Sequence, residues 1–158
     1  MAPPTPPRLV ASTACWLTAA VVTLGLSVVG RDLLDPAAAA LYDRLIAAPS
    51  ADPSQTDALH EIANNGPMWL TYAQLVLAVG NLLAAVLMTG RRSLSARTVL
   101  VLTGTVTAAV SVLFYVVMLS LPHSDAMPVR ILAEAQLLLI VAAIVLMLGG
   151  SVTKWLRP

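Results

Sequence analysis

The sequence predicts an all-α membrane protein built on a four-transmembrane-helix bundle. Of its 158 residues, 58% are hydrophobic and only 11% are charged, whereas a soluble domain normally carries about 25% charged residues. Such a chain has too few solvated groups to cover a globule in water, so it needs an apolar solvent. The second observation is that the chain contains four long runs without a single charged residue.

The four uncharged runs extend over residues 9–30, 62–90, 98–122 and 135–153. Each is long enough to cross a bilayer as a helix. A helix is expected because a backbone in lipid must satisfy its own hydrogen bonds. The predicted order is an N-terminal segment 1–8; spans 9–30, 67–89, 98–121 and 131–150; loops 31–66, 90–97 and 122–130; and a tail 151–158.

Prolines and tryptophans indicate the ends of the spans. Pro67 follows the turn-prone residues 64–66 and suits the first turn of the second span, while Pro128 precedes the fourth span. Trp69 and Trp155 lie at span ends, where amphipathic rings sit at the level of the lipid headgroups. The second span is therefore expected to begin at Pro67.

Charge alternates between successive non-membrane segments. The N-terminal segment, the loop 90–97 and the tail carry basic residues and no acidic ones: Arg8, Arg91, Arg92, Arg97, Lys154 and Arg157. The other two loops and the start of the fourth span hold all eight acidic residues, together with Arg31, Arg44 and Arg130. Basic loops stay in the cytoplasm, so the sequence predicts a multi-pass protein of the cell membrane with both termini cytoplasmic.

The spans also show internal similarity. The first and third spans align without gaps from Arg8 and Arg97, and the second and fourth share Ala-Gln-Leu-x-Leu, beginning at Ala73 and Ala135. We interpret this as two tandem helical hairpins of the same orientation, packed around a pseudo-two-fold axis along the membrane normal.

The loop 31–66 is the longest segment outside the spans. Leu34, Ala38, Leu41 and Leu45 follow helical spacing, and a second helix is expected to start at Ser54. This extracytoplasmic helical loop either caps the outer end of the bundle or offers a docking surface to an extracytoplasmic partner.

Four polar residues fall inside or near the spans. Gln74 and Asn81 are seven residues apart and share one helix face, and Gln136 is the repeat counterpart of Gln74. Buried amides in lipid commonly join helices by hydrogen bonds; the alternative is a polar path between the hairpins. Glu134 is the only carboxylate near a span interior, and Arg130 lies one turn before it, at i,i+4 spacing.

The outer loops hold the two histidines. His60 and Glu61 begin a pattern similar to H-E-x-x-H, but Asn64 stands at the place of the second histidine, and only His123 could add another imidazole. We therefore predict no metal and no cofactor. A membrane enzyme at the outer face would require His60, Glu61, His123 and Asp125 to converge.

Two further features bear on partners. The loop residues Arg91, Arg92 and Arg97 are a topology signal that could also bind anionic lipid headgroups. The pairs Gly80 with Ala84 and Gly104 with Ala108 allow close helix approach, either within the bundle or to a second copy. The net charge of +1 gives no indication of nucleic-acid binding.

The overall layout resembles small four-span integral membrane proteins of actinobacteria. The resemblance rests on the proline-rich segment 1–7, Arg8 before the first span, Gly90-Arg91-Arg92 and Ala96-Arg97 before the third, and Trp155 in a short tail. It covers the whole chain, and it implies no common activity and no site residues.

These observations favour a non-enzymatic function. We expect an accessory or scaffold subunit of a membrane assembly, or a homo-oligomer that associates through its small-residue helix faces. The alternative is a small transporter or channel that uses Gln74, Asn81, Glu134 and Gln136.

Overall fold

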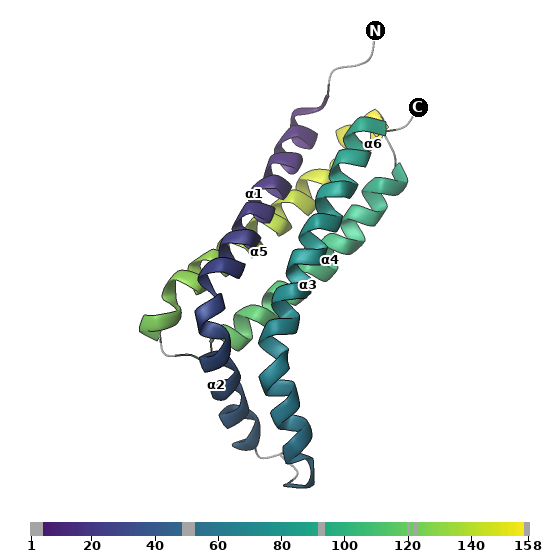
Figure 1. Ribbon diagram of the computed structural model, residues 1–158. Helices are drawn as coiled ribbons and strands as arrows, with labels where there is room; N and C mark the ends of the chain where they lie inside the picture. The colour runs from purple at the N-terminus through teal and green to yellow at the C-terminus, as the bar shows by residue number, and fades with distance from the viewer. Residues whose placement is uncertain (1–4, 49–52, 92–93, 120, 122, 157–158) are drawn as a thin grey trace.

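The chain folds into a bundle of helices (Figure 1). The computed structural model describes residues 5–48, 53–91, 94–119, 121 and 123–156; the side chains of Pro53, Arg91 and residues 123–125 lie outside that description. The long helices are α1 (Pro7–Val29), α3 (Thr56–Arg91), α4 (Leu94–Met118) and α5 (His123–Met147). The shorter elements are η1 (Arg31–Leu33), α2 (Leu34–Ile46), η2 (Pro53–Gln55) and α6 (Gly150–Leu156).

In the part of the chain that the structure describes, four helices are long and apolar enough to cross a membrane, as expected of a multi-pass membrane protein. The stretches are Pro7–Val29, Thr56–Gly90, Leu94–Met118 and Ala126–Met147. Large apolar side chains point outward from all four, among them Val21, Val76, Leu102 and Leu138, each more than 60% exposed. A surface of this kind suits lipid, because burying apolar side chains in hydrocarbon removes them from water.

The helices form a ring in which α1 packs most extensively against α5, and α3 against α4, while α4–α5 and α1–α3 contacts close the ring. Figure 1 shows both chain ends at one end of the bundle, here called the termini end. At the opposite end, α2 lies beside the first turns of α3. We call α2 together with residues 56–66 the α2–α3 hairpin, and this end the hairpin end.

Helix α3 is longer than the predicted second span. It runs unbroken from Thr56 through Pro67 to Arg91, so Pro67 lies inside a 36-residue helix instead of opening a new one. Proline removes one backbone donor from a helix. The turns before it are held by α2, whose Ala37 and Ala38 are buried, as is Ala63 on α3. Tertiary packing thus overrides the turn tendency of residues 64–66.

The fourth span and the tail also differ from prediction. Helix α5 begins at His123 and contains Pro128, so it starts eight residues before the expected 131. Residues 151–156, expected in a tail, belong to α6, where Val152 and Leu156 are fully buried. Their i,i+4 spacing puts both on the face that packs on the bundle, which explains why this short helix forms.

The core is divided into two apolar clusters. The termini-end cluster includes Trp16, Met88, Leu100, Ile140 and Met147 and the buried face of α6. The hairpin-end cluster is built around Leu26, Ala37, Phe114, Met118, Val129 and their neighbours.

Gly104 permits the closest contact in the termini-end cluster. A Cβ at this position would lie 2.6 Å from Cη2 of Trp16 and 3.3 Å from Cδ1 of Ile144. Trp16 therefore reaches across the bundle from α1 to α4 through the space left by the missing side chain. The small residue at this position serves packing within the bundle, one of the two uses expected for it.

Candidate functional site

One recess lies between the two helices of the α2–α3 hairpin. This hairpin pocket has a volume of about 300 Å³ and is lined by Asp35, Ala38, Ala39, Tyr42, Asp43, His60, Ala63 and Asn64. All of these residues come from α2 and from the part of α3 that precedes Pro67. The pocket exists because α2 folds back against α3 with alanines at the contact, which leaves the longer side chains at the edges.

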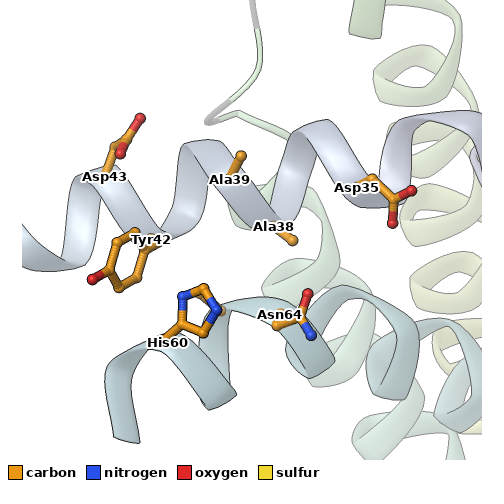
Figure 2. Close-up of a pocket in the computed structure, with 8 residues that line it drawn as sticks. Asp35, Ala38, Ala39, Tyr42, Asp43, His60 and Asn64 are labelled. Atoms are coloured by element: carbon orange, nitrogen blue, oxygen red, sulfur yellow. The ribbon is translucent and has the colours of Figure 1, made fainter. Parts of the chain in front are cut away.

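The walls of the hairpin pocket are aromatic and acidic. The rings of Tyr42 and His60 meet edge to face, with centroids 5.0 Å apart and an interplanar angle of 90°. Figure 2 shows these rings facing each other across the two helices, and the carboxylate of Asp35 beyond Ala38 on the same helix. Asp43 lines the rim and points away from α3 in this view. Two carboxylates line the pocket, and neither lysine nor arginine is among the described residues around it.

The outer-face residues named from the sequence do not form one site. His60 lines the hairpin pocket, whereas Glu61 lines a separate recess with Ile62, Asn65 and Trp69. The side chains of His123 and Asp125 lie outside the described residues. Within the part of the chain that is described, no three His, Cys, Asp or Glu side chains form a group that could hold a metal.

Asn81 joins α3 to α4. Its Nδ2 donates to Oγ1 of Thr107 at 2.8 Å, and its Oδ1 accepts from Oγ1 of Thr103 at 2.6 Å. Both threonine hydroxyls also lie within hydrogen-bond distance of carbonyls one turn earlier in their own helix. Asn81 and Thr107 are each 2% exposed, so this network is a buried link between two helices.

Gln136 and Ser12 join α5 to α1. Nε2 of Gln136 donates to Oγ1 of Thr23 at 2.9 Å, and Oγ of Ser12 donates to the carbonyl of Ala143 at 2.8 Å. Gln74 is buried as well, and no hydrogen bond is formed by its Nε2. The three predicted amides are therefore all interior, and two of them connect helices.

Glu134 lies on the outside of the bundle. Its Oε1 accepts a hydrogen bond from the hydroxyl of Tyr115 on α4 at 2.7 Å. Nη2 of Arg130 donates to the carbonyls of Met118 and Leu121, at 3.2 and 2.8 Å. Arg44 of α2 donates to the carbonyl of Leu119, the residue after Met118. Two arginines thus cap the C-terminal end of α4, where a helix presents unpaired carbonyls and partial negative charge.

The basic loop is only partly described. Nη1 of Arg97 donates to Oγ1 of Thr153 at 2.8 Å, which ties the start of α4 to α6. The side chain of Arg91 and all of Arg92 lie outside the described residues. Arg97 thus has a structural contact in addition to the topology signal predicted for it.

Sequence reasoning missed several polar residues that the structure places at these sites. Asp35, Tyr42 and Asp43 were not expected to surround His60, because this depends on how α2 pairs with α3. The hydroxyl residues Ser12, Thr23 and Ser111 were overlooked because serine and threonine in apolar runs ordinarily bond to their own helix. Their signal was weak but present: each sits among small residues that allow close helix contact.

The hairpin pocket can bind a positively charged group, and the bundle interior can hold polar groups between helices. A carboxylate attracts a cation, and an aromatic face adds cation–π attraction. Comparison of the chain with protein-family models, with curated proteins and with solved structures finds no match.

Proposed function

We propose that this chain is a non-enzymatic accessory or scaffold subunit of a membrane assembly. The four spans anchor the protein, and the α2–α3 hairpin presents the hairpin pocket to a protein partner. The observation that carries the proposal is that the hairpin extends past the end of α4 and bears a recess edged by Asp35, Asp43 and Tyr42.

The charge of the hairpin indicates what the partner offers. The acidic residues Asp32, Asp35, Asp43, Asp57 and Glu61 outnumber Arg31 and Arg44 in this region. A partner segment that carries a lysine or arginine is complementary to this surface, and its cationic group would enter the hairpin pocket. Complementary charge favours encounter and sets the register of an interface.

The topology that supports this function places both termini in the cytoplasm and the α2–α3 hairpin outside the cell membrane. The basic residues Arg8, Arg97 and Lys154 belong to the start of α1, the start of α4 and α6, which lie at the termini end. The acidic residues Asp35, Asp43, Asp57 and Glu61 belong to α2 and the first turns of α3, at the hairpin end. Under the positive-inside rule this arrangement gives an extracytoplasmic hairpin. The partner is then a membrane protein with an exposed outer segment, or a protein outside the membrane.

Tandem duplication accounts for the packing of the ring. An axis along the membrane normal that exchanges α1 with α4 and α3 with α5 converts the α1–α5 contact into the α4–α3 contact, and these two are the most extensive. The duplicated hairpins then differ mainly by the inserted segment that forms α2. In this account, the duplicated helical hairpins anchor the protein in the membrane, and the inserted segment adds the binding surface.

Photo-crosslinking from the hairpin tests the proposed function. A photoreactive residue at Ala39, which is exposed and lines the hairpin pocket, is expected to capture one protein in cells. The same protein should be recovered with the chain in mild detergent. Asp35→Asn combined with Asp43→Asn should reduce its capture, while Asp57→Asn, outside the pocket on the same hairpin, should not. Recovery of a lone monomer without any crosslink would contradict the proposal; a crosslink to a second copy would identify a homo-oligomer.

A small transporter or channel is the second candidate. It is favoured by the buried amides of Gln74, Asn81 and Gln136 in the bundle interior. Two apolar clusters flank these amides, so transport would require the helices to separate. Solute flux into proteoliposomes that is lost in Gln136→Leu would favour this candidate over the scaffold.

A further inference from the structure

Besides Nε1 of Trp16, three side-chain atoms in the middle of the bundle are buried without a hydrogen-bond partner among the described protein atoms. They are Nε2 of Gln74, Oγ of Ser111 and Oε1 of Gln136. The three residues are 2%, 1% and 0% exposed. Buried polar groups are almost always paired, and in lipid there is no bulk water to replace a missing partner.

The three residues lie at the same depth in the bundle. Trp16 of α1 meets Gly104 of α4, and on α3 Asn81 bonds to Thr103 and Thr107, which flank Gly104. These contacts fix one level of the bundle. Seven residues are two helical turns and return to nearly the same face. Seven residues from Trp16, Gly104 and Asn81 toward the hairpin end lie Thr23, Ser111 and Gln74, respectively.

Gln136 joins this level through its hydrogen bond to Thr23. Each of the four spans therefore contributes one buried polar residue at this depth. We call Thr23, Gln74, Ser111 and Gln136 the polar layer. It separates the two apolar clusters: Ala19 and Leu26 of α1 belong to different clusters, as do Ile140 and Ala133 of α5.

The hydrogen bonds within the layer define which groups remain to be paired. Oγ1 of Thr23 donates its hydrogen to the carbonyl of Ala19 at 2.8 Å, so it can only accept from Gln136. Gln136 must then present its amide nitrogen to Thr23 and its Oε1 elsewhere. The layer consequently offers an acceptor at Gln136, a donor at Nε2 of Gln74, and a hydroxyl at Ser111 that can act as either.

We propose that the polar layer is a binding site for one water molecule. The water accepts hydrogen bonds from Nε2 of Gln74 and from the hydroxyl of Ser111, and it donates one to Oε1 of Gln136. Buried waters in proteins typically make about three such bonds to polar groups that lack other partners. The donor set selects a neutral guest, because an amide N–H would repel a cation and the layer carries no charge. Thr23, through Gln136, connects the water to the fourth helix.

The site is independent of the proposed docking function, because it lies between the apolar clusters and the hairpin pocket lies beyond them. Water-to-amide magnetisation transfer tests it in lipid nanodiscs with deuterated lipid and ¹⁵N-labelled glutamine and asparagine side chains. We expect a transfer peak at the side-chain amide of Gln74. The side-chain amide of Asn81 is the matched control: it is equally buried and bonded to Thr107, so it should give none.

Two variants complete the test. Gln136→Leu removes the main acceptor, and the peak at Gln74 should be lost. Ser111→Ala removes one hydroxyl from the site without adding bulk, and it should weaken the transfer peak at Gln74. This variant also tests the water site if Gln136→Leu does not fold. The proposal is overturned if Gln74 shows no transfer in the wild-type protein, or if the peak is unchanged in a folded Ser111→Ala or Gln136→Leu protein. A coupling across a direct hydrogen bond, between the side-chain amide nitrogen of Gln74 and ¹³C-labelled Cδ of Gln136, would also overturn it.

Discussion

Single residues in this bundle interior act by their size or by a hydrogen bond to another helix. Asn81 shows the second case, because its amide bonds to threonines of α4 that also reach carbonyls of their own helix. Such bonds between membrane helices contribute about 1 kcal/mol or less, since the separated helices also find partners. Gly104 shows the first case, where a missing side chain admits the indole of Trp16. At the residue scale, close packing matters more to stability than any one polar contact.

Gly104→Ala should destabilise the bundle by about 1–3 kcal/mol, because the new methyl group would overlap the indole of Trp16. Gly80→Ala is the matched control: Gly80 is exposed on α3 and an added Cβ would meet no atom within 4 Å, so its replacement should not destabilise the bundle. Unfolding by SDS titration in bicelles measures both.

A smaller partner should rescue the Gly104 variant. Trp16→Leu in the Gly104→Ala background is expected to recover part of the lost stability, because the two side chains share one space. Equal losses from Gly104→Ala and Gly80→Ala would contradict this account of the contact.

At the scale of elements, the short helices complete the long ones. Arg44 of α2 and Arg130 of α5 donate to the last carbonyls of α4. Helix α6 turns back on the termini end, where Val152 and Leu156 are fully buried in the same apolar cluster as Leu9, Leu100 and Met147. Each end of the bundle is therefore closed by a segment outside the four spans.

Leu156→Ala should cost about 2–5 kcal/mol, as is usual when a buried leucine is truncated in a packed core. Leu148→Ala is the control, because Leu148 is 58% exposed between α5 and α6. The free energy of unfolding in bicelles, with the protein at equal detergent ratio, distinguishes them. If α6 did not contribute to stability, both variants would unfold with the same free energy as the wild-type protein.

For the whole molecule, composition predicted the number of spans and their helical character, because charge-free runs of this length have few alternatives in lipid. The lengths of α3 and α5 could not be predicted, because proline is common in the first turn of a helix. Pro67 and Pro128 lie inside their helices instead, where tertiary contacts hold the turns before them. The amides of Gln74, Asn81 and Gln136 were identifiable as rare polar groups in apolar runs. Their hydrogen-bond partners could not be predicted, because the sequence of a single helix does not determine how it is aligned with its neighbours.

The hairpin pocket was the least predictable part of the molecule. Helical spacing predicted α2, and His60 was a candidate site residue because Glu61 follows it, as in H-E-x-x-H. The meeting of Tyr42 with His60, however, depends on the turn between α2 and α3 and on the continuity of α3 through Pro67. Sequence periodicity describes faces of single helices, whereas a pocket arises from the pairing of two.

The proposed topology can be tested across the whole molecule with single cysteines. Cys15, the one native cysteine, is first replaced by serine. In intact cells, a membrane-impermeant maleimide should label Gln55→Cys at the tip of the α2–α3 hairpin. Ser95→Cys, at the start of α4 near the termini end, should react only after the membrane is permeabilised. The reverse pattern would place the hairpin in the cytoplasm.

The pairing of α1 with α5 has a consequence for synthesis. The first span to leave the ribosome finds its most extensive partner only in the last span. Until α5 arrives, Ser12 lacks the carbonyl of Ala143 and Thr23 lacks the amide of Gln136. We therefore expect the first helix to remain incompletely packed until α5 is inserted. A chain truncated before α5 is expected to expose these polar groups to lipid, even if each of its helices inserts.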